Sequence, residues 1–318
     1  MLSRILHLLV LLSLTGAGAS FGQQPAARPQ PNPAELEELI RRAGLSVSEY
    51  QAKFKDLTAD EEQRIEEYDG EGKVTKQRRI AAALVIYQSQ LDPTQMVEYR
   101  DVRSVDGVAV KKREERLVSL LKRSAKAESA KKELDRIYRE SRRYDLEHSF
   151  YGMTLNQGLP LVERARAAFQ FTLAGRERVD GHDAVVVDYQ QVSQTPHLTF
   201  NLAGLPTPLK GAEGFYRGRL WLDAETAQLR REVRELTLRL PSPGRPLVMY
   251  RFDLDYADSR FGFLTPRRMV ATIYSRGRTG ADKKPELLQG GKITFEYGAF
   301  NRFAVEEPDA SLDPPAKP

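Results

Sequence analysis

Apolar and polar residues alternate with a period of two over much of the segment between positions 214 and 303. Apolar side chains recur at every second position from Val248 to Tyr256, and a second such run extends from Ile293 to Tyr297. This alternation is typical of β-strands that bury one face and expose the other. No catalytic motif interrupts these runs. The pattern therefore predicts an antiparallel β protein whose interior is its working surface.

The first half of the chain also contains strand patterns. Residues 61–68 and 73–88 flank the glycine-rich segment 69–72, which predicts a hairpin. Residues 80–87 are apolar on both faces, as in strands that are covered on both sides. A strand at 95–105 follows.

Two Asp-Gly pairs, at positions 106–107 and 180–181, each lie between extended runs. Asp-Gly tolerates the positive φ angles of tight hairpins, so both pairs are interpreted as turns rather than as parts of a reaction centre. The first turn is expected to lead into a further extended segment at 108–121.

Helix signals appear at three places. Asn32 as N-cap and Pro33 in the first turn begin a helix that Gly44 is expected to end. A second short helix is predicted at 48–57. A long helix at 124–145 carries a narrow apolar stripe, which we expect to pack on the concave face of the sheet as a lid; an isolated coiled coil would need more heptads. The lid contacts are assigned to Leu134, Ile137 and Tyr138.

The N-terminus has the pattern of an export signal. Arg4 precedes an apolar run at 5–14, and small residues at 17–19 form a cleavage site, so we expect a cut after Ala19. The apolar run is shorter than the roughly 20 residues of a membrane-spanning helix, and no later segment is apolar enough to span. The mature chain is therefore expected to be soluble and periplasmic or secreted.

The rest of the chain divides by composition. Residues 20–33 are rich in Pro, Gln and Ala and are predicted to be a disordered leader. A single domain is expected at 34–305, with a disordered tail at 306–318. The 49 basic and 44 acidic residues give a net charge of only +5, too small and too evenly spread to predict nucleic-acid binding. The chain has no cysteine.

Candidate chemistry is sparse. Outside the signal peptide, His148, His182 and His197 are far apart, which does not favour a metal site, and no cofactor is predicted. There is no nucleophile motif and no glycine-rich phosphate loop. Asp253 and Asp255 share one strand face and could bind a cation, but a solvent-facing polar row predicts the same residues and is the preferred interpretation. No enzymatic activity is predicted.

Several segments resemble a known family. The hairpin at 214–235, the turn region at 175–181 and the closing segment 300–303 are similar to parts of the LolA/LolB outer-membrane lipoprotein carriers, over about the C-terminal half of the chain. The segment 100–117 resembles uncharacterised exported bacterial proteins. The carrier resemblance implies an α+β fold, in which a strongly twisted antiparallel sheet forms an open half β-barrel and helices cover its concave face.

The sequence leaves more than one function open. The leading hypothesis is a non-catalytic protein that holds a lipid, acyl chain or lipoprotein in an apolar cavity. The alternative is a structural or interaction protein of the cell envelope, with a filled core and an envelope protein as its partner. An unrecognised enzyme is the third. The candidate cavity wall consists of Leu84, Ile86, Val248, Tyr250, Phe252 and Leu254.

Overall fold

The computed structural model describes residues 32–89, 91–92, 95–115, 119, 129–198, 212–240, 246–279 and 285–302. The predicted export signal, almost all of the predicted leader and the predicted tail lie outside the described residues. So do residues 120–128, where the long helix was expected to begin. The described residues belong to one unit, 31–318.

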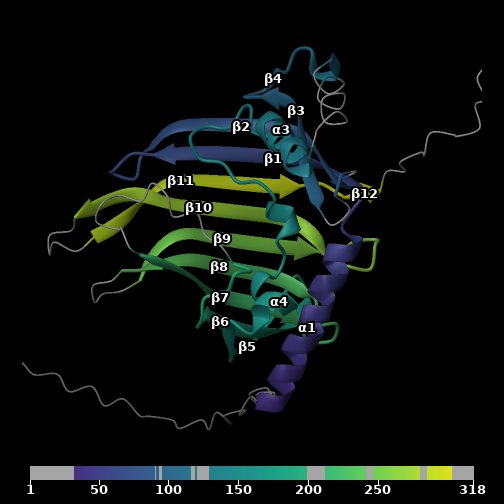
Figure 1. Cartoon of the computed structure of the whole chain (residues 1–318), viewed down its shortest axis with the longest axis vertical. Helices are drawn as coiled ribbons and strands as arrows, with labels where there is room; N and C mark the ends of the chain where they lie inside the picture. Colours follow the sequence, from purple (N-terminus) through teal and green to yellow (C-terminus); the bar gives the residue numbers. More distant parts are fainter. Residues whose placement is uncertain are drawn as a thin grey trace, which may run out of the picture. The chain divides into compact units, whose positions relative to one another are not determined.

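The strands of the described residues form one antiparallel sheet of twelve strands (Figure 1). Its order is β4-β3-β2-β1-β11-β10-β9-β8-β7-β6-β5, with β12 paired to β1 off this path, so the sheet stays open at β4 and β5. The prediction of a large open antiparallel sheet is confirmed. The strands are β1 (Leu57–Tyr68), β2 (Val74–Gln88), β3 (Met96–Val105), β4 (Val108–Ala109), β5 (Phe169–Val179), β6 (His182–Gln191), β7 (Glu213–Asp223), β8 (Leu229–Arg239), β9 (Leu247–Ala257), β10 (Thr265–Thr279), β11 (Pro285–Tyr297) and β12 (Asn301–Arg302).

One face of the sheet, here called the inner face, carries the main hydrophobic core. Alternate residues such as Leu84, Val187, Phe252 and Phe295 point to this face and are buried together. The opposite, outer face carries most of the charged side chains. Successive side chains of a strand point to opposite faces of the sheet. The two-residue period of the sequence therefore places apolar residues on the inner face and charged residues on the outer face.

Both Asp-Gly pairs form the predicted turns. Asp106 and Gly107 have φ angles of 51° and 81°, and Asp180 and Gly181 have 49° and 85°. The prediction of a strand at 108–121 is wrong for the described part of this range, where β4 contains only two residues; residues 116–118 and 120–121 lie outside the described residues. Residues 111–116 are all charged, so they offer no apolar side chain at alternate positions to hold a strand on the sheet.

A single helix, α1 (Pro33–Lys53), replaces the two short helices predicted at 32–44 and 48–57. It begins as expected, with the Asn32 side chain accepting a hydrogen bond from the Glu35 backbone N–H at 3.0 Å. Gly44 does not end the helix. A Cβ atom at this position would lie 3.0 Å from the Leu161 carbonyl oxygen, so the glycine allows close packing instead.

Helix α3 (Ala130–Ser141) is the described part of the long predicted helix. Its Ile137 packs with Val97 and Tyr99 of β3, a cluster separate from the main core. The Ser141 hydroxyl accepts a hydrogen bond from the Arg100 N–H, a backbone donor of this strand, at 3.1 Å. The expectation that this helix covers the concave face is therefore wrong: it lies against the outer side of β3, where it protects strand backbone that β4 is too short to pair.

The inner face is covered instead by α1 and by residues 142–168, a connection here called the strap. Figure 1 shows the strap in teal, passing in front of the sheet from α3 toward α4. It contains the short helices η1 (Met153–Leu155), η2 (Leu159–Leu161) and α4 (Glu163–Arg166). No helix in the described part of the chain is long and apolar enough to span a bilayer.

Candidate binding site

The strap fills the space over the middle of the inner face. The Phe150 ring meets the rings of Tyr250 and Phe252 edge-on, at centroid distances of 5.5 and 5.1 Å. On the α1 side, the Tyr50 hydroxyl donates a hydrogen bond to the Thr154 carbonyl oxygen at 2.7 Å. The strap is thus packed between the sheet and α1.

A buried ion cluster on β3 and β1 holds the first half of the strap. Arg100 lies 2.7 Å from the Glu98 carboxylate and 2.6 Å from that of Glu61, and the three side chains are at most 2% exposed. Glu98 also accepts hydrogen bonds from the Gly152 N–H at 3.1 Å and from the Thr154 N–H at 3.2 Å. The negative charge of the Glu98 carboxylate is therefore stabilised both by the Arg100 guanidinium and by backbone N–H groups of the strap.

Burial and the neighbouring charges shift the pKa values of this cluster in opposite directions. Burial lowers the pKa of Arg100, but the carboxylates of Glu61 and Glu98 outweigh it, and the net pKa is well above the ordinary value. Burial raises the pKa of Glu61, and attraction to Arg100 offsets this rise only in part. Arg100 is therefore the fixed positive charge around which the acidic groups are arranged.

A second buried pair on β8 holds the next part of the strap. Arg234 forms two contacts of 2.7 Å with the Glu232 carboxylate and donates a hydrogen bond to the Asn156 carbonyl oxygen at 2.8 Å. Glu232 accepts hydrogen bonds from the Gly158 N–H and the Tyr189 hydroxyl, both at 3.2 Å. The strap therefore has two anchors, one on each half of the sheet.

The same local sequence produces both anchors. Glu98 and Arg100, like Glu232 and Arg234, are two positions apart and so share the inner face of their strand. Each glycine that donates to an anchor carboxylate has a positive φ angle and precedes a one-turn helix, η1 or η2. Sequence reasoning missed these anchors, although charged residues at inward positions of otherwise apolar strands were a usable signal.

Asp145, at the start of the strap, offers a test of the buried charges. Burial raises its pKa to about 6, against the attraction of Arg100 and Arg142. Between pH 4 and 6 the folded protein therefore holds a proton that the unfolded chain has released, and this group makes stability fall as pH rises through that window. We expect Asp145→Asn to be more stable than wild type by about 1–3 kcal/mol at pH 7 and equal to it near pH 3.5.

Urea unfolding of both proteins at several pH values measures this difference, and Asp135→Asn, on the exposed surface of α3, is the matched control. A difference between Asp145→Asn and wild type that is the same at pH 3.5 and pH 7 would show that the carboxyl does not titrate in this window.

The six residues predicted as a cavity wall lie on β2 and β9. Leu84, Ile86, Phe252 and Leu254 are buried members of the main core. Tyr250 is half-buried beneath Phe150, and Val248 is half-buried near the start of its strand. The structure thus brings most of them into one core, with side chains of the strap and α1 packed on the same core.

The predicted lid residues lie against β3 and along a neighbouring groove. Ile137 is buried against β3. Leu134 packs against the same cluster and, together with Tyr138, lines a groove of about 860 Å³. Tyr50 of α1 and Phe54, the residue after this helix, line the same groove. This surface, the α1–α3 groove, includes the polar side chains of Asp135, Gln51, Gln95, Asn156 and Arg164.

A more apolar opening lies between the first half of α1 and the edge strand β5. This α1–β5 cavity has a volume of about 690 Å³. Ile40 and Phe169 in its wall are buried members of the main core, and Leu36 and Phe171 pack against that core. The core therefore reaches the surface here beside a strand whose outer edge is unpaired within the described sheet. The remaining lining residues are Pro33, Ala34, Glu37, Glu38, Arg41, Glu163, Arg166 and Ala167.

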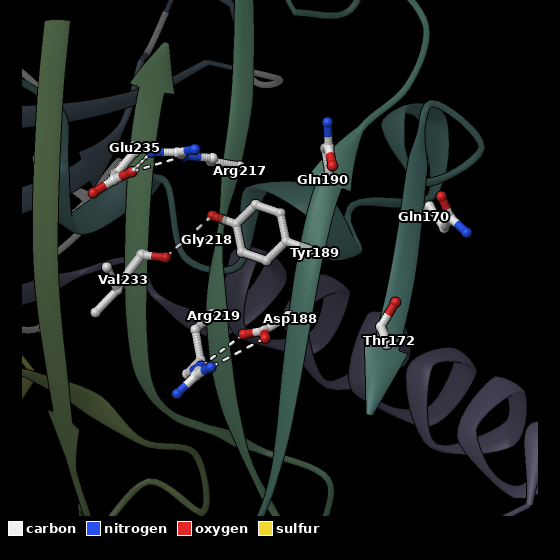
Figure 2. Close-up of a pocket in the computed structure, with 10 residues that line it drawn as sticks. All are labelled: Gln170, Thr172, Asp188, Tyr189, Gln190, Arg217, Gly218, Arg219, Val233 and Glu235. Carbon is white, nitrogen blue, oxygen red and sulfur yellow. Dashed lines mark hydrogen bonds and ion pairs between the residues drawn. The ribbon is translucent and has the colours of Figure 1, made fainter. Parts of the chain in front are cut away.

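The outer face has a smaller groove of about 490 Å³ over β5 to β8, lined mostly by polar side chains (Figure 2). Arg219 contacts both carboxylate oxygens of Asp188, at 2.6 and 3.0 Å, and Arg217 pairs with Glu235 at 2.8 Å. Such exposed ion pairs are typical of a solvated surface and contribute little energy.

The aspartates considered for cation binding also lie on the outer face. Asp253 pairs with Arg251 at 2.9 Å and Asp255 with Arg231 at 2.7 Å, so both carboxylates are engaged by guanidinium groups. His182 lies within 3.8 Å of Asp223 and 3.3 Å of Asp258. Within the described ranges, no three His, Asp or Glu side chains are grouped as a metal site would require.

Comparisons with known proteins give similarities in structure only. No protein-family model matches the sequence, and no curated protein does. A DUF1329 family protein from Desulfovibrio piger is 11% identical, over 87% of this chain and 96% of its own, with a TM-score of 0.35. A putative outer membrane lipoprotein-sorting protein domain from Vibrio parahaemolyticus is 10% identical, over 84% and 95%, with a TM-score of 0.35.

A LolA superfamily protein from Nitrosomonas europaea is 11% identical, over 85% of this chain and 94% of its own, with a TM-score of 0.32. The lipoprotein-sorting proteins that the sequence resembles thus recur among the similar solved structures. A likeness at these TM-scores carries no inference about ligand or activity.

Proposed function

We propose that this chain is a non-catalytic binding protein that takes up the acyl chain of a lipid in the α1–β5 cavity. The observation that carries the proposal is that the hydrophobic core reaches the surface there, with Leu36, Ile40, Phe169 and Phe171 in the wall. A volume of about 690 Å³ lies in the range of pockets that hold small ligands. Each methylene transferred from water contributes about 0.8 kcal/mol.

The β2 and β9 residues suggested by the sequence have a different place in this proposal. Leu84 and Phe252 are packed in the core. We propose that they contact ligand only when the strap has moved away from the sheet. The α1–β5 cavity needs no such movement, so it is the first site to test. The periplasmic or secreted location that the sequence predicts is part of the same proposal.

One observation favours the alternative, an envelope interaction protein with a filled core. The strap, with Phe150 against Tyr250 and two buried ion anchors, occupies the middle of the inner face. A protein without a ligand, whose strap simply fills the inner face as part of the core, would show the same packing. The two functions differ in whether the purified protein contains or accepts lipid.

Native mass spectrometry and organic extraction of protein purified from its own host test the proposal, followed by titration with a fluorescent C12 fatty acid. We expect retained lipid and saturable uptake. Leu36→Asp, which places a charge in the cavity wall, is expected to weaken uptake at least about tenfold. Leu45→Asp, on the exposed side of the same helix, is the matched control and should leave uptake unchanged.

Absence of retained lipid together with absence of uptake by folded wild-type protein would replace the carrier proposal with the interaction protein. Equal loss of uptake in both variants would mean that the cavity is not the site.

A further inference from the structure

Arg166 occupies a distinct position in the α1–β5 cavity. It is the last residue of α4 and is half-buried, and its guanidinium lies against the backbone of α1 at Gly44. A Cβ atom at Gly44 would lie 2.8 Å from Nη1 of Arg166. The glycine that was expected to end α1 therefore makes room for this cation in the cavity wall.

The other charged groups of the cavity are either paired or in water. Arg41 and Glu38 form a two-point ion pair, with both contacts at 2.7 Å. Glu37 and Glu163 are exposed. Within the described part of the chain, the Arg166 side chain forms no ion pair and donates no hydrogen bond; its backbone N–H donates to the Val162 carbonyl oxygen at 2.9 Å. Solvent screens a half-buried charge less than an exposed one, so the Arg166 guanidinium is better placed to attract an anion than the two exposed glutamates are to repel it.

We propose that the ligand is an anionic amphiphile whose carboxylate or phosphate group binds Arg166 while its acyl chain lies against Leu36, Ile40 and Phe171. This inference rests on the proposed function and adds the chemical class of the headgroup. A guanidinium presents a planar fork of N–H donors that matches both anions with two parallel hydrogen bonds. The ligand supplies the acceptor that the described protein does not offer to this cation.

Displacement of the fluorescent fatty acid by four C12 compounds separates the headgroup from the chain. Dodecanoate and dodecyl phosphate carry the two anionic groups, dodecanol is neutral, and dodecyltrimethylammonium is cationic. We expect both anions, or one of them, to bind wild type about tenfold more tightly than dodecanol, and the cation to bind more weakly than dodecanol. A preference for one anion distinguishes a free fatty acid from a phosphate ester.

Two matched variants locate the effect. Arg166→Gln should bring the affinity for the anions down to that for dodecanol, with dodecanol binding unchanged. Arg164→Gln removes the same charge from the same short helix, but this residue lines the α1–α3 groove, so the preference for anions should remain. Arg166→Lys keeps the charge without the fork and is expected to retain part of the preference.

The outcomes for the two proposals are separable. If no C12 compound binds folded wild-type protein, the proposed function fails. If dodecanol binds but the anions bind no better, acyl binding stands and the role of Arg166 is wrong. The order of affinities of the four C12 compounds is measured on wild-type protein, so the inference is testable even if Arg166→Gln does not fold. An anion preference that persists in a folded Arg166→Gln protein would also overturn it.

Discussion

Replacing Glu98 with alanine is expected to lower the free energy of unfolding by roughly 3–5 kcal/mol. The substitution leaves the buried Arg100 with Glu61 as the remaining one of its two salt-bridge partners, and it removes the acceptor for the backbone N–H groups of Gly152 and Thr154. Removing one partner of a buried charge pair costs far more than the pair contributes, because the other charge keeps its desolvation penalty. Urea unfolding followed by circular dichroism measures the change.

Glu62→Ala is the control for this substitution. It removes the same type of side chain from an exposed position on β1 and should change stability by less than about 0.5 kcal/mol. Limited proteolysis adds a second measurement, since the strap of Glu98→Ala should be cut faster than that of wild type. A loss of less than about 1 kcal/mol, with an unchanged cleavage rate, would mean that Glu98 does not anchor the strap.

Gly218→Ala is expected to destabilise the protein by about 3 kcal/mol or more. A Cβ atom on Gly218 would lie 1.9 Å from the Val233 carbonyl oxygen and 2.8 Å from the Tyr189 hydroxyl, so β7 and β8 would have to separate. Figure 2 shows the Tyr189 ring extending past β7 toward Val233. Displacing this ring also disturbs the contact of its hydroxyl with Glu232, which belongs to the second anchor.

The control is Gly70→Ala in the β1–β2 turn, where nothing lies within 4 Å of a new Cβ atom. Thermal unfolding of the two variants should separate them clearly. Similar melting temperatures would show that the sheet adapts at Gly218 without loss.

The strands were predictable because their signal is local. A run such as Val248 to Tyr256 shows both its extended conformation and its buried face through the two-residue period. The Asp-Gly turns were equally clear, since few residues other than glycine and aspartate tolerate positive φ angles at adjacent positions. These signals were sufficient to predict an antiparallel sheet; that the sheet is open was implied only by the family resemblance.

Helix α1 shows where a local signal misled. Gly44 is typical of a helix end, but the apolar spacing of Ile40, Val47 and Tyr50 continues through it and marks one stripe. A glycine alone does not distinguish a stop from a close approach by a distant segment. The segment that approaches Gly44 is the strap, whose sequence has no regular hydrophobic period from which its position could be predicted.

The site was harder to predict for a related reason. The strap lies where it does because of Glu98 and Glu232, which are far apart in the sequence and meet the strap only in the folded sheet. The α1–β5 cavity likewise combines residues of α1, α4 and β5. Alternation identified residues such as Leu84 as inward-facing, but it gives no information on what packs above them.

The pairing of β1 with β11 constrains the order in which this chain assembles. Ile65 lies opposite Ile293, which is more than 200 positions later in the sequence, so the two halves of the sheet join only after β11 is available. The Glu98 anchor needs only β1 to β3 and the strap, whereas the Glu232 anchor must wait for β8. A partly synthesised chain therefore exposes the unpaired edge of β1, which favours aggregation, and the long sequence separation between β1 and β11 slows folding.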